Sequence, residues 1–261
     1  MATLPTLFIS HGSPMLAIQD SPARQFLQQL GKSLPRPSAI VVASAHWELA
    51  DGTGVTCAKQ PKTIHDFGGF PDALFAIDYP APGAPALAEQ VAKLLEISGL
   101  SVRRDPDRGL DHGAWVPLQL MYPQADIPVV QVALPRGASP LAHERLGNAL
   151  SALRDQPILV IGSGSLTHNL HEFRGQPIDT PAPEWVTDFA AWMHNTLQDN
   201  QLAALRDYRQ HAPHAVRNHP TEEHLLPLFV ALGAAGAGAR AERIHTSMQY
   251  GILAMDVIAF T

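Results

Sequence analysis

The sequence is poor in cysteine, in charge and in long apolar runs. Cys57 is the single cysteine in 261 residues, which excludes a disulfide framework, a cysteine-based zinc finger and an iron–sulfur cluster. Charged residues make up 16% of the chain, the net charge is −6 and no Lys/Arg run occurs, so we expect no nucleic-acid partner. Since no stretch of about 18 apolar residues is free of breakers and charges, we expect no membrane span.

The beginning of the sequence also lacks a basic segment followed by an apolar stretch and a small-residue cleavage site. We therefore expect a cytoplasmic protein. The apolar fraction of 46% predicts a folded chain and not a disordered one. With no internal repeat and no long linker, residues 1–261 are predicted to form a single catalytic domain. The sequence makes no prediction of the oligomeric state.

Short apolar runs rich in β-branched residues alternate with helical patterns. Turn residues bound each run, as is typical of strands buried on both faces of a sheet. The predicted strands are Thr6–Ser10, Ala39–Ala45, Ile127–Leu134 and Ile158–Ile161. The predicted helices are Pro22–Gly31, Pro85–Ser98, Pro140–Arg154, Pro183–Leu197 and Thr221–Leu232. This alternation predicts an α/β fold: a single domain with a mostly parallel central sheet flanked by helices.

The C-terminal part of the chain carries three finer expectations. Pro227 lies inside the last helical pattern, so that helix is expected to kink there or to begin later than Thr221. The glycine-rich run Gly233–Gly238 predicts the end of this helix and a loop. Segments near Gly54–Ala58 and Ile244–Ala259 are expected to add further strands, some of them antiparallel.

Histidine, by contrast, is abundant, with 13 in the chain. It is the commonest metal ligand and a common acid–base catalyst. His11 directly follows the first predicted strand, His46 follows the second, and His168 lies shortly after the strand Ile158–Ile161. Ligands of open α/β sheets bind outside the carboxyl ends of the strands, so these histidines converge on one crevice if their strands are parallel neighbours.

Two more histidines lie at predicted junctions between a loop and a helix. Thr221 has the character of a helix N-cap, which places His224 in the first turn, and His112 lies at another such junction. Any one of these histidines is equally typical of a hydrogen-bonded loop residue. It is the three strand ends together that favour a shared site.

Substrate-binding residues are expected beside these histidines. We assign Ser13, Trp47 and His219 to this role. Trp47 and Trp115 would wall an aromatic pocket, although packing in the core explains them equally well. His219, next to Pro220, would also orient the segment that carries His224.

Other catalytic motifs are missing. The pattern H-E-x-x-H does not occur, the segment Gly162–Leu166 breaks a nucleophile elbow, and Gly162 and Gly164 lack the third glycine of a dinucleotide fingerprint. These two glycines instead favour a close backbone approach at the crevice. Neutral imidazoles without thiolates suit Zn, Fe, Cu or Ni, and three protein ligands leave a position open for substrate. The residues thus indicate a metal enzyme that performs either zinc hydrolysis or iron–oxygen chemistry.

Several segments spread over most of the chain resemble the class III extradiol ring-cleaving dioxygenases. The resemblance is strongest to the DOPA-4,5-dioxygenase-like branch, within the superfamily of the protocatechuate 4,5-dioxygenase catalytic subunit. The segments are Ser10–Pro14, Ser44–Trp47, Asp66–Pro71, Leu110–Trp115, Gly162–Asn169, Asn218–Thr221 and Met248–Gly251. Their combination is specific to this family, whereas Ser-His-Gly-Ser alone is not.

The resemblance implies a mononuclear metal site in one α/β domain. His11 and His46 match metal ligands. The third ligand of the wider superfamily is a glutamate, but the matching position here is His224, with Glu222 or Glu223 as the alternative. A three-histidine site suits zinc, whereas Fe(II) oxygenases typically use two histidines and a carboxylate. We expect Fe(II) for activity and Zn(II) in isolated protein, because zinc binds more tightly in the affinity series.

The same resemblance implies roles for the remaining histidines. His168 would be the acid–base residue and a possible fourth ligand, and His112 would hydrogen-bond a substrate hydroxyl or oxygen. The implied reaction is extradiol cleavage, with O2, of a catechol-type ring: DOPA or a related catechol. A small aromatic substrate and O2 are then the expected partners.

Three alternatives stay open at this point. A zinc-dependent hydrolase or lyase would use the same histidines without O2, and an inactive relative would act only as a binding module. A tetrapyrrole chelatase also begins with a strand followed by His-Gly-Ser.

An acidic ring substituent would require a cation beside the pocket. The candidate cations are Arg24, Lys32, Arg136 and Arg217.

Overall fold

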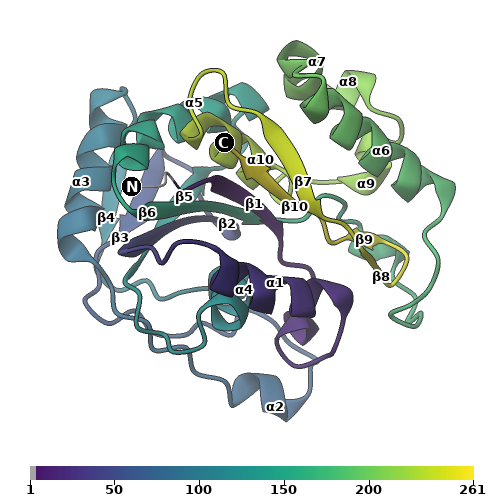
Figure 1. Cartoon of the computed structure of the whole chain (residues 1–261), viewed down its shortest axis with the longest axis horizontal. Coiled ribbons are helices and arrows are strands. Elements are labelled where there is room, and N and C mark those ends of the chain that lie inside the picture. The colour runs from purple at the N-terminus through teal and green to yellow at the C-terminus, as the bar shows by residue number, and fades with distance from the viewer. Residues whose placement is uncertain (1–3) are drawn as a thin grey trace.

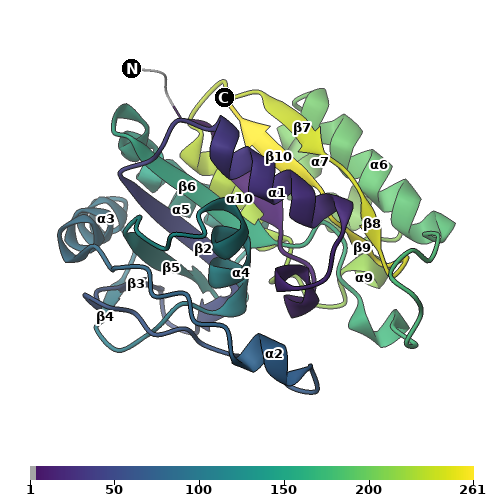
Figure 2. The ribbon, with the colours of Figure 1, turned by 60° about the horizontal axis from the view of Figure 1, so that its bottom comes forward.

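A computed structural model of the chain describes residues 4–261. Its strands are β1 (Thr6–Ser10), β2 (Ala39–Leu49), β3 (Thr53–Thr56), β4 (Val102–Asp105), β5 (Val129–Pro135), β6 (Ile158–Gly164), β7 (Ala241–His245), β8 (Met248–Gln249), β9 (Leu253–Ala254) and β10 (Val257–Phe260). Eight of them form one sheet in the order β4-β3-β5-β2-β6-β1-β10-β7, and β8 pairs with β9. The first and last strands of the chain are therefore neighbours, so purple and yellow segments lie side by side (Figure 2).

The centre of the sheet is parallel. β5, β2, β6 and β1 run in one direction, and their carboxyl ends share one edge. Antiparallel pairs occur toward the margins, between β1 and β10, β10 and β7, and β3 and β5. The predicted α/β fold with a mostly parallel sheet is confirmed, as are the expected antiparallel strands.

Helices cover both faces of this sheet (Figure 1). The α-helices are α1 (Pro22–Ser33), α2 (Asp72–Phe75), α3 (Pro85–Ile97), α4 (His112–Met121), α5 (Pro140–Leu150), α6 (Glu184–Gln198), α7 (Leu202–Arg206), α8 (Tyr208–His211), α9 (Ala215–Asn218) and α10 (Leu226–Ala234). Short 3-10 helices are η1 (Pro14–Ala17), η2 (Ser151–Asp155) and η3 (Leu170–Glu172). α1 and α4 pack on one face, and α3, α5 and α10 pack on the other, so each face has its own apolar core.

Two strands extend further than the sequence predicts. β2 continues to Leu49, because its pairing with β5 is interrupted after Ala43 and resumes at Glu48. His46 therefore lies within an irregular part of β2 and not after the strand. β6 likewise continues to Gly164, which leaves His168 four residues beyond its end.

The helix that follows His224 begins later than the pattern Thr221–Leu232. α10 starts at Leu226, with Pro227 in its first turn, where a missing N–H costs nothing. Thr221 is not its N-cap, since the Thr221 hydroxyl donates to Glu223 Oε1 (3.0 Å). His224 thus lies in the turn before the helix, in agreement with the alternative that Pro227 marks a later start. The glycine-rich run after it ends the helix, as predicted.

α4 begins at His112, where the sequence predicts a junction between a loop and a helix, but its extent was not predicted. Nine of its residues are buried, so it shows no amphipathic stripe, and it contains Pro117. A helix that is apolar on all sides cannot be recognised from a 3.6-residue period.

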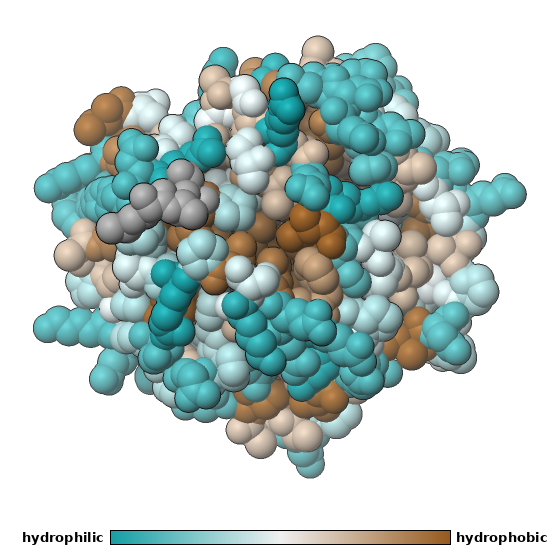
Figure 3. Space-filling model, in the orientation of Figure 1, coloured by the Kyte–Doolittle hydropathy of each residue, from teal (hydrophilic) through white to brown (hydrophobic). Residues whose placement is uncertain are grey.

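The molecular surface is mostly hydrophilic on the face shown in Figure 3. Apolar side chains gather near the middle of this face and at its lower edge, where Figure 1 places α2. Between residues 4 and 261, no helix has the length and apolar character needed to cross a membrane. The cytoplasmic location stays a prediction from the sequence.

Candidate metal centre

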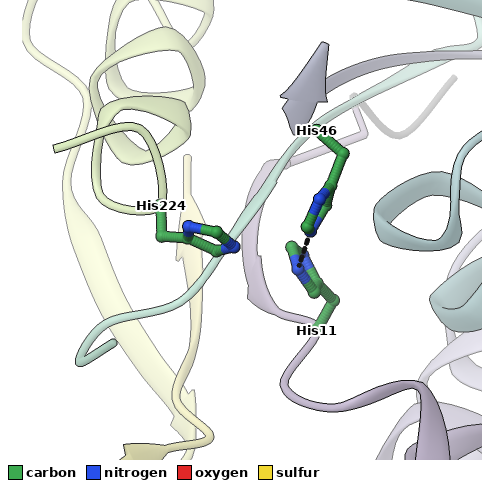
Figure 4. A group of neighbouring side chains, drawn as sticks. All are labelled: His11, His46 and His224. Atoms are coloured by element: carbon green, nitrogen blue, oxygen red, sulfur yellow. Dashed lines mark hydrogen bonds between the residues drawn. The ribbon is translucent and has the colours of Figure 1, made fainter. Parts of the chain in front are cut away.

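Five histidines from separate parts of the chain meet at the carboxyl edge of the parallel strands. His11 directly follows β1, His46 lies in the irregular end of β2, and His224 lies just before α10. These three side chains point toward one another (Figure 4). His112 is the first residue of α4, and His168 follows β6. The convergence expected from the strand ends is what the fold produces.

Three of these histidines offer nitrogen atoms to a common point. The Nε2 atoms of His11 and His46 are 3.0 Å apart. One nitrogen from each of His11, His46 and His224 lies within 4.8 Å of the others. This spacing suits a single ion held by three imidazoles.

The opposite ring nitrogen of each histidine has a hydrogen-bond acceptor. The Ser163 hydroxyl donates its own proton to the carbonyl of Gly113. Its oxygen therefore accepts a hydrogen bond from His11 Nδ1 (3.0 Å). His224 Nδ1 donates to Glu223 Oε1 (3.0 Å). With Nδ1 protonated, the lone pair of each ring is on Nε2 and faces the common point.

His46 also directs its Nδ1 at an acceptor, but over a longer distance. Its Nδ1 lies 3.4 Å from Asp66 Oδ2, so its Nε2 also carries the lone pair. Two lone pairs 3.0 Å apart on His11 and His46 repel each other unless a cation lies between them. Burial lowers the pKa of His46 to about 4, which makes a proton a poor candidate for that cation. A bound metal ion satisfies the arrangement, so the residues present fit a metal site.

Burial also lowers the pKa values of His11 and His224. Both pKa values lie well below the usual range, because neighbouring histidines lower them further. All three rings are therefore neutral at pH 7, which is the form that binds metal.

Asp66 joins two of the histidines. Its Oδ1 accepts from His112 Nδ1 and from the His112 backbone N–H, each at 3.0 Å, while its Oδ2 faces His46. Although burial raises the pKa of this carboxyl, the hydrogen bonds and charge of His112 prevail and lower it to about 2. An ionised Asp66 thus orients both rings, and it places His112 beside His46, with ring centroids 3.9 Å apart.

The ring of His168 lies against that of His224. The two rings stack with centroids 3.5 Å apart and an interplanar angle of 9°. The His168 backbone N–H donates to the carbonyl of Asn218 (3.1 Å), which fixes the segment after β6. Burial lowers the pKa of His168 to about 4, so the ring is neutral at pH 7 and able to accept a proton.

Glycines allow the elements that carry these rings to approach one another. A Cβ on Gly164 would lie 2.0 Å from the carbonyl oxygen of His224, and one on Gly162 would lie 2.0 Å from that of Pro227. Gly113 similarly leaves room for Ser44 Oγ and for the rings of His46 and His11. The prediction that Gly162 and Gly164 permit a close backbone approach is confirmed.

Several supporting residues were not predicted. Asp111 is fully buried, caps α4, and accepts hydrogen bonds from Ser44 Oγ (2.7 Å) and Arg108 Nη2 (3.0 Å). Asp66 and Ser163 were missed as well, because each acts through partners distant in sequence. All three lie in segments that carry the family resemblance, Asp66–Pro71, Leu110–Trp115 and Gly162–Asn169, but no role was assigned to them.

A cavity of about 510 Å³ opens from the histidine cluster. Its lining residues are Gly12, Ser13, Pro14, Met15, His46, Asp66, Phe67, Gly68, Phe70, His112, His168, Leu170, Phe173, His224, Tyr250, Ile252 and Leu253. His11 is almost completely buried beneath it. A volume of this size suits a small aromatic molecule.

Two of the three expected substrate-binding residues do not reach this cavity. Successive side chains of a strand point to opposite faces, so Trp47 turns away from the side of His46. The Trp47 ring packs beneath the Arg108 guanidinium, whose central carbon lies 4.8 Å from the ring centroid. His219 is fully buried, and its Nε2 donates to the carbonyl of Leu166 (2.9 Å). Ser13 does line the cavity.

The proposed carboxylate alternative for the third ligand also finds other partners. Glu223 accepts a hydrogen bond from His224 Nδ1, the ring nitrogen that faces away from the common point. Glu222 accepts a hydrogen bond from the Tyr208 hydroxyl (2.8 Å). Trp115, the second candidate for an aromatic wall, is buried in the core, and its indole N–H donates to the carbonyl of Ile64.

The fold and the histidine cluster define a metal-dependent enzyme. Residues 5–259 match the family model described as the catalytic LigB subunit of aromatic ring-opening dioxygenase. The chain belongs to this family and is a ring-cleaving dioxygenase.

Individual relatives cover nearly all of the chain. It is 45% identical to the 4,5-DOPA dioxygenase extradiol of Beta vulgaris, over 98% of this chain and 96% of that protein. It is 43% identical to the protein of the same name from Escherichia coli strain K12, over 88% and 85% of the two chains. A crystal structure of an uncharacterized protein from Escherichia coli K12 is similar in fold, with a TM-score of 0.82, 35% identity and coverage of 99% of this chain and 100% of that one.

Proposed function

We propose that His11, His46 and His224 hold Fe(II), and that the protein uses it to open DOPA or a related catechol with O2. The family and the named relatives support extradiol cleavage, in which the ring opens outside its two hydroxyls. One observation carries the ligand assignment: three imidazoles, each with its Nδ1 proton directed to an acceptor, turn their Nε2 lone pairs to one point at the base of the cavity.

The metal would activate O2 and favour ionisation of the catechol hydroxyls. The chain's own residues orient the substrate and move its protons. A ring nitrogen of His168 accepts a proton from a substrate hydroxyl, and the resulting imidazolium later returns it to oxygen. His112, held by Asp66, is placed to hydrogen-bond the substrate or oxygen. The apolar wall excludes water and holds the aromatic ring over the cluster.

Iron is proposed as the working metal although three histidines also suit zinc. Zinc has no redox chemistry, whereas cleavage by O2 requires a metal that exchanges electrons. Zinc binds such sites more tightly than Fe(II), so protein isolated without added iron is expected to contain Zn(II).

Oxygen uptake tests this proposal directly. Protein loaded anaerobically with Fe(II) is mixed with DOPA, protocatechuate and 4-methylcatechol, while O2 and the visible spectrum are recorded together. We expect O2 consumption with a new yellow absorbance for the Fe(II) form and none for the Zn(II) form. No uptake across the panel with iron bound would overturn the proposal, and O2-independent turnover by the Zn(II) form would support the hydrolase alternative.

A further inference from the structure

The wall of the cavity changes character with distance from the histidines. His46, Asp66, His112, His168 and His224 make one end polar. The rest is formed mainly by apolar and aromatic side chains. These are Met15, Phe67, Phe70, Leu170, Phe173, Tyr250, Ile252 and Leu253. A catechol whose hydroxyls face the histidines would therefore direct its ring substituent at this apolar part.

The two polar side chains of the apolar part are already engaged. Ser13 Oγ accepts a hydrogen bond from the backbone N–H of Met15 (3.3 Å). The Tyr250 hydroxyl donates to Gln19 Oε1 (2.9 Å). The Tyr250 hydroxyl thus has no proton left to donate, whereas Ser13 keeps its hydroxyl proton. Neither side chain carries the positive charge that would pair with a substrate carboxylate.

Tyr250 is held in this position against its backbone preference. Its φ of 54° is unfavourable for a bulky residue, and such strain persists only where the surroundings enforce it. Its N–H bonds the carbonyl of Ile178, and its ring meets that of Phe173 edge to face at 5.5 Å. The aromatic wall is thus built by specific contacts.

No lysine or arginine lines the cavity among residues 4–261. The cations suggested by the sequence have other partners. Arg24 donates to the carbonyl of Leu16, and Arg136 lies 3.7 Å from a Glu48 oxygen. Lys32 lines a different hollow, beside α1.

The arginines nearest in sequence to Leu170 and Phe173, which lie at the rim of the cavity, also have hydrogen-bond or ion-pair partners. Arg217 lies 2.9 Å from a Glu172 oxygen, and Arg174 donates to the backbone carbonyls of His171 and Phe173. A carboxylate on the substituent would therefore lose its water without gaining a charged partner, which is costly.

Two large apolar side chains on the wall are exposed to solvent. Leu170 is 58% exposed and Phe173 is 44% exposed. Exposed neighbouring apolar groups beside a cavity are typical of a surface that an apolar ligand covers. An alkyl or aryl substituent reaching the rim would remove both from water.

We propose that the substrate is a catechol with an uncharged apolar substituent, and that Leu170 and Phe173 select it over catechols with an anionic side chain. This inference rests on the proposed function, since it assumes that the hydroxyls face the histidines. It ranks DOPA, whose side chain carries a carboxylate, below catechols of similar size with an uncharged apolar substituent.

A matched pair of ligands tests the proposal. 4-Propylcatechol and 3-(3,4-dihydroxyphenyl)propanoate have side chains of equal carbon number and differ in the terminal carboxylate. kcat/KM is measured by O2 uptake with the Fe(II) form, and Kd is measured by calorimetry with the Zn(II) form. We expect the neutral catechol to be favoured at least about tenfold in both measurements, because the unpaired carboxylate is desolvated. Equal or better values for the acid would overturn the inference.

Rim variants supply the second arm. Phe173→Arg and Leu170→Arg place a cation beside the cavity and should shift the ratio of acid to neutral catechol upward by about fivefold or more. Leu141→Arg on α5, where the side chain is 37% exposed, is the control and should leave the ratio unchanged. An unchanged ratio in both rim variants would show that these residues do not select the substituent. If no catechol supports O2 uptake, the proposed function fails, and the calorimetric ranking still decides the inference.

Discussion

Each histidine of the cluster depends on the group that its other nitrogen contacts. Ser163 and Glu223 accept from His11 and His224, and Asp66 faces His46, so the lone pairs converge without a proton between them. Such partners fix ring orientation and basicity, and losing one typically weakens metal binding by about 10–100-fold.

Removal of a ligand should cost more than removal of its partner. His11→Ala and His46→Ala are expected to weaken metal binding by more than about 100-fold, because each deletes a nitrogen of the site itself. Metal content after dialysis against a weak chelator measures this. His194→Ala, on the partly exposed side of α6, is the matched control and should retain its metal. A cluster variant that keeps full metal content would remove that residue from the ligand set.

His168 should separate chemistry from metal binding. His168→Ala is expected to keep most of the metal and to lower kcat by about 10²–10⁴-fold, the usual contribution of general acid–base catalysis. Metal analysis and O2 uptake on the same sample are the readout. Turnover equal to that of the unmodified protein would exclude His168 from proton transfer, while loss of the metal would identify it as a ligand.

At the scale of elements, the position of His224 is set by how closely α10 approaches β6. Gly162 permits that approach, since a Cβ there would lie 2.0 Å from the carbonyl of Pro227, a backbone atom that cannot move alone. Gly162→Ala is expected to lower the free energy of unfolding by about 1–3 kcal/mol and to weaken metal binding as well. Urea denaturation measures the first effect. Gly68→Ala is the control, because a Cβ there would meet open space.

At the scale of the whole molecule, one sheet joins the two ends of the chain. β1 lies between β6 and β10, so the first strand cannot separate without breaking contacts with residues from the second half. We propose that residues 1–261 form a single domain, and we expect one cooperative unfolding transition. Far-ultraviolet circular dichroism and tryptophan fluorescence should report the same midpoint; two distinct midpoints would indicate separate units.

Stability should also depend on pH through a buried carboxyl at the sheet margin. Burial raises the pKa of Asp256 to about 6, and Arg243, at 3.5 Å, only partly opposes this. The folded state therefore binds a proton more tightly than the unfolded state does. This contribution to stability is fully present below the unfolded pKa and is lost as pH rises through about 6.

Asp256→Asn should remove that dependence. We expect its free energy of unfolding at pH 7 to exceed that of the unmodified protein by about 1–3 kcal/mol, and the two proteins to converge near pH 4. Thermal unfolding measured between pH 4 and pH 7 tests this. Asp155→Asn, at an exposed carboxyl, should leave the pH dependence unchanged. A variant that is less stable than the unmodified protein at pH 7 would contradict the expectation.

The sequence by itself determined the elements whose signal is local. The strand Thr6–Ser10 was predicted with its observed bounds, and the helix starts at Pro22, Pro85 and Pro140 follow from proline in a first turn. Strand ends followed by histidine were sufficient to predict a shared site, because parallel strands place their carboxyl ends along one edge. The family also followed from short motifs.

The tertiary structure alone decided which neighbours those histidines contact. The pairing of Asp66 with His112 and of Ser163 with His11 joins segments that are 46 and 152 residues apart, and no local pattern encodes such contacts. The irregular end of β2 decided that Trp47 turns away from the cavity while His46 turns toward it. Metal binding requires atoms placed within a few tenths of an ångström, and only the packing of distant segments fixes positions to that accuracy.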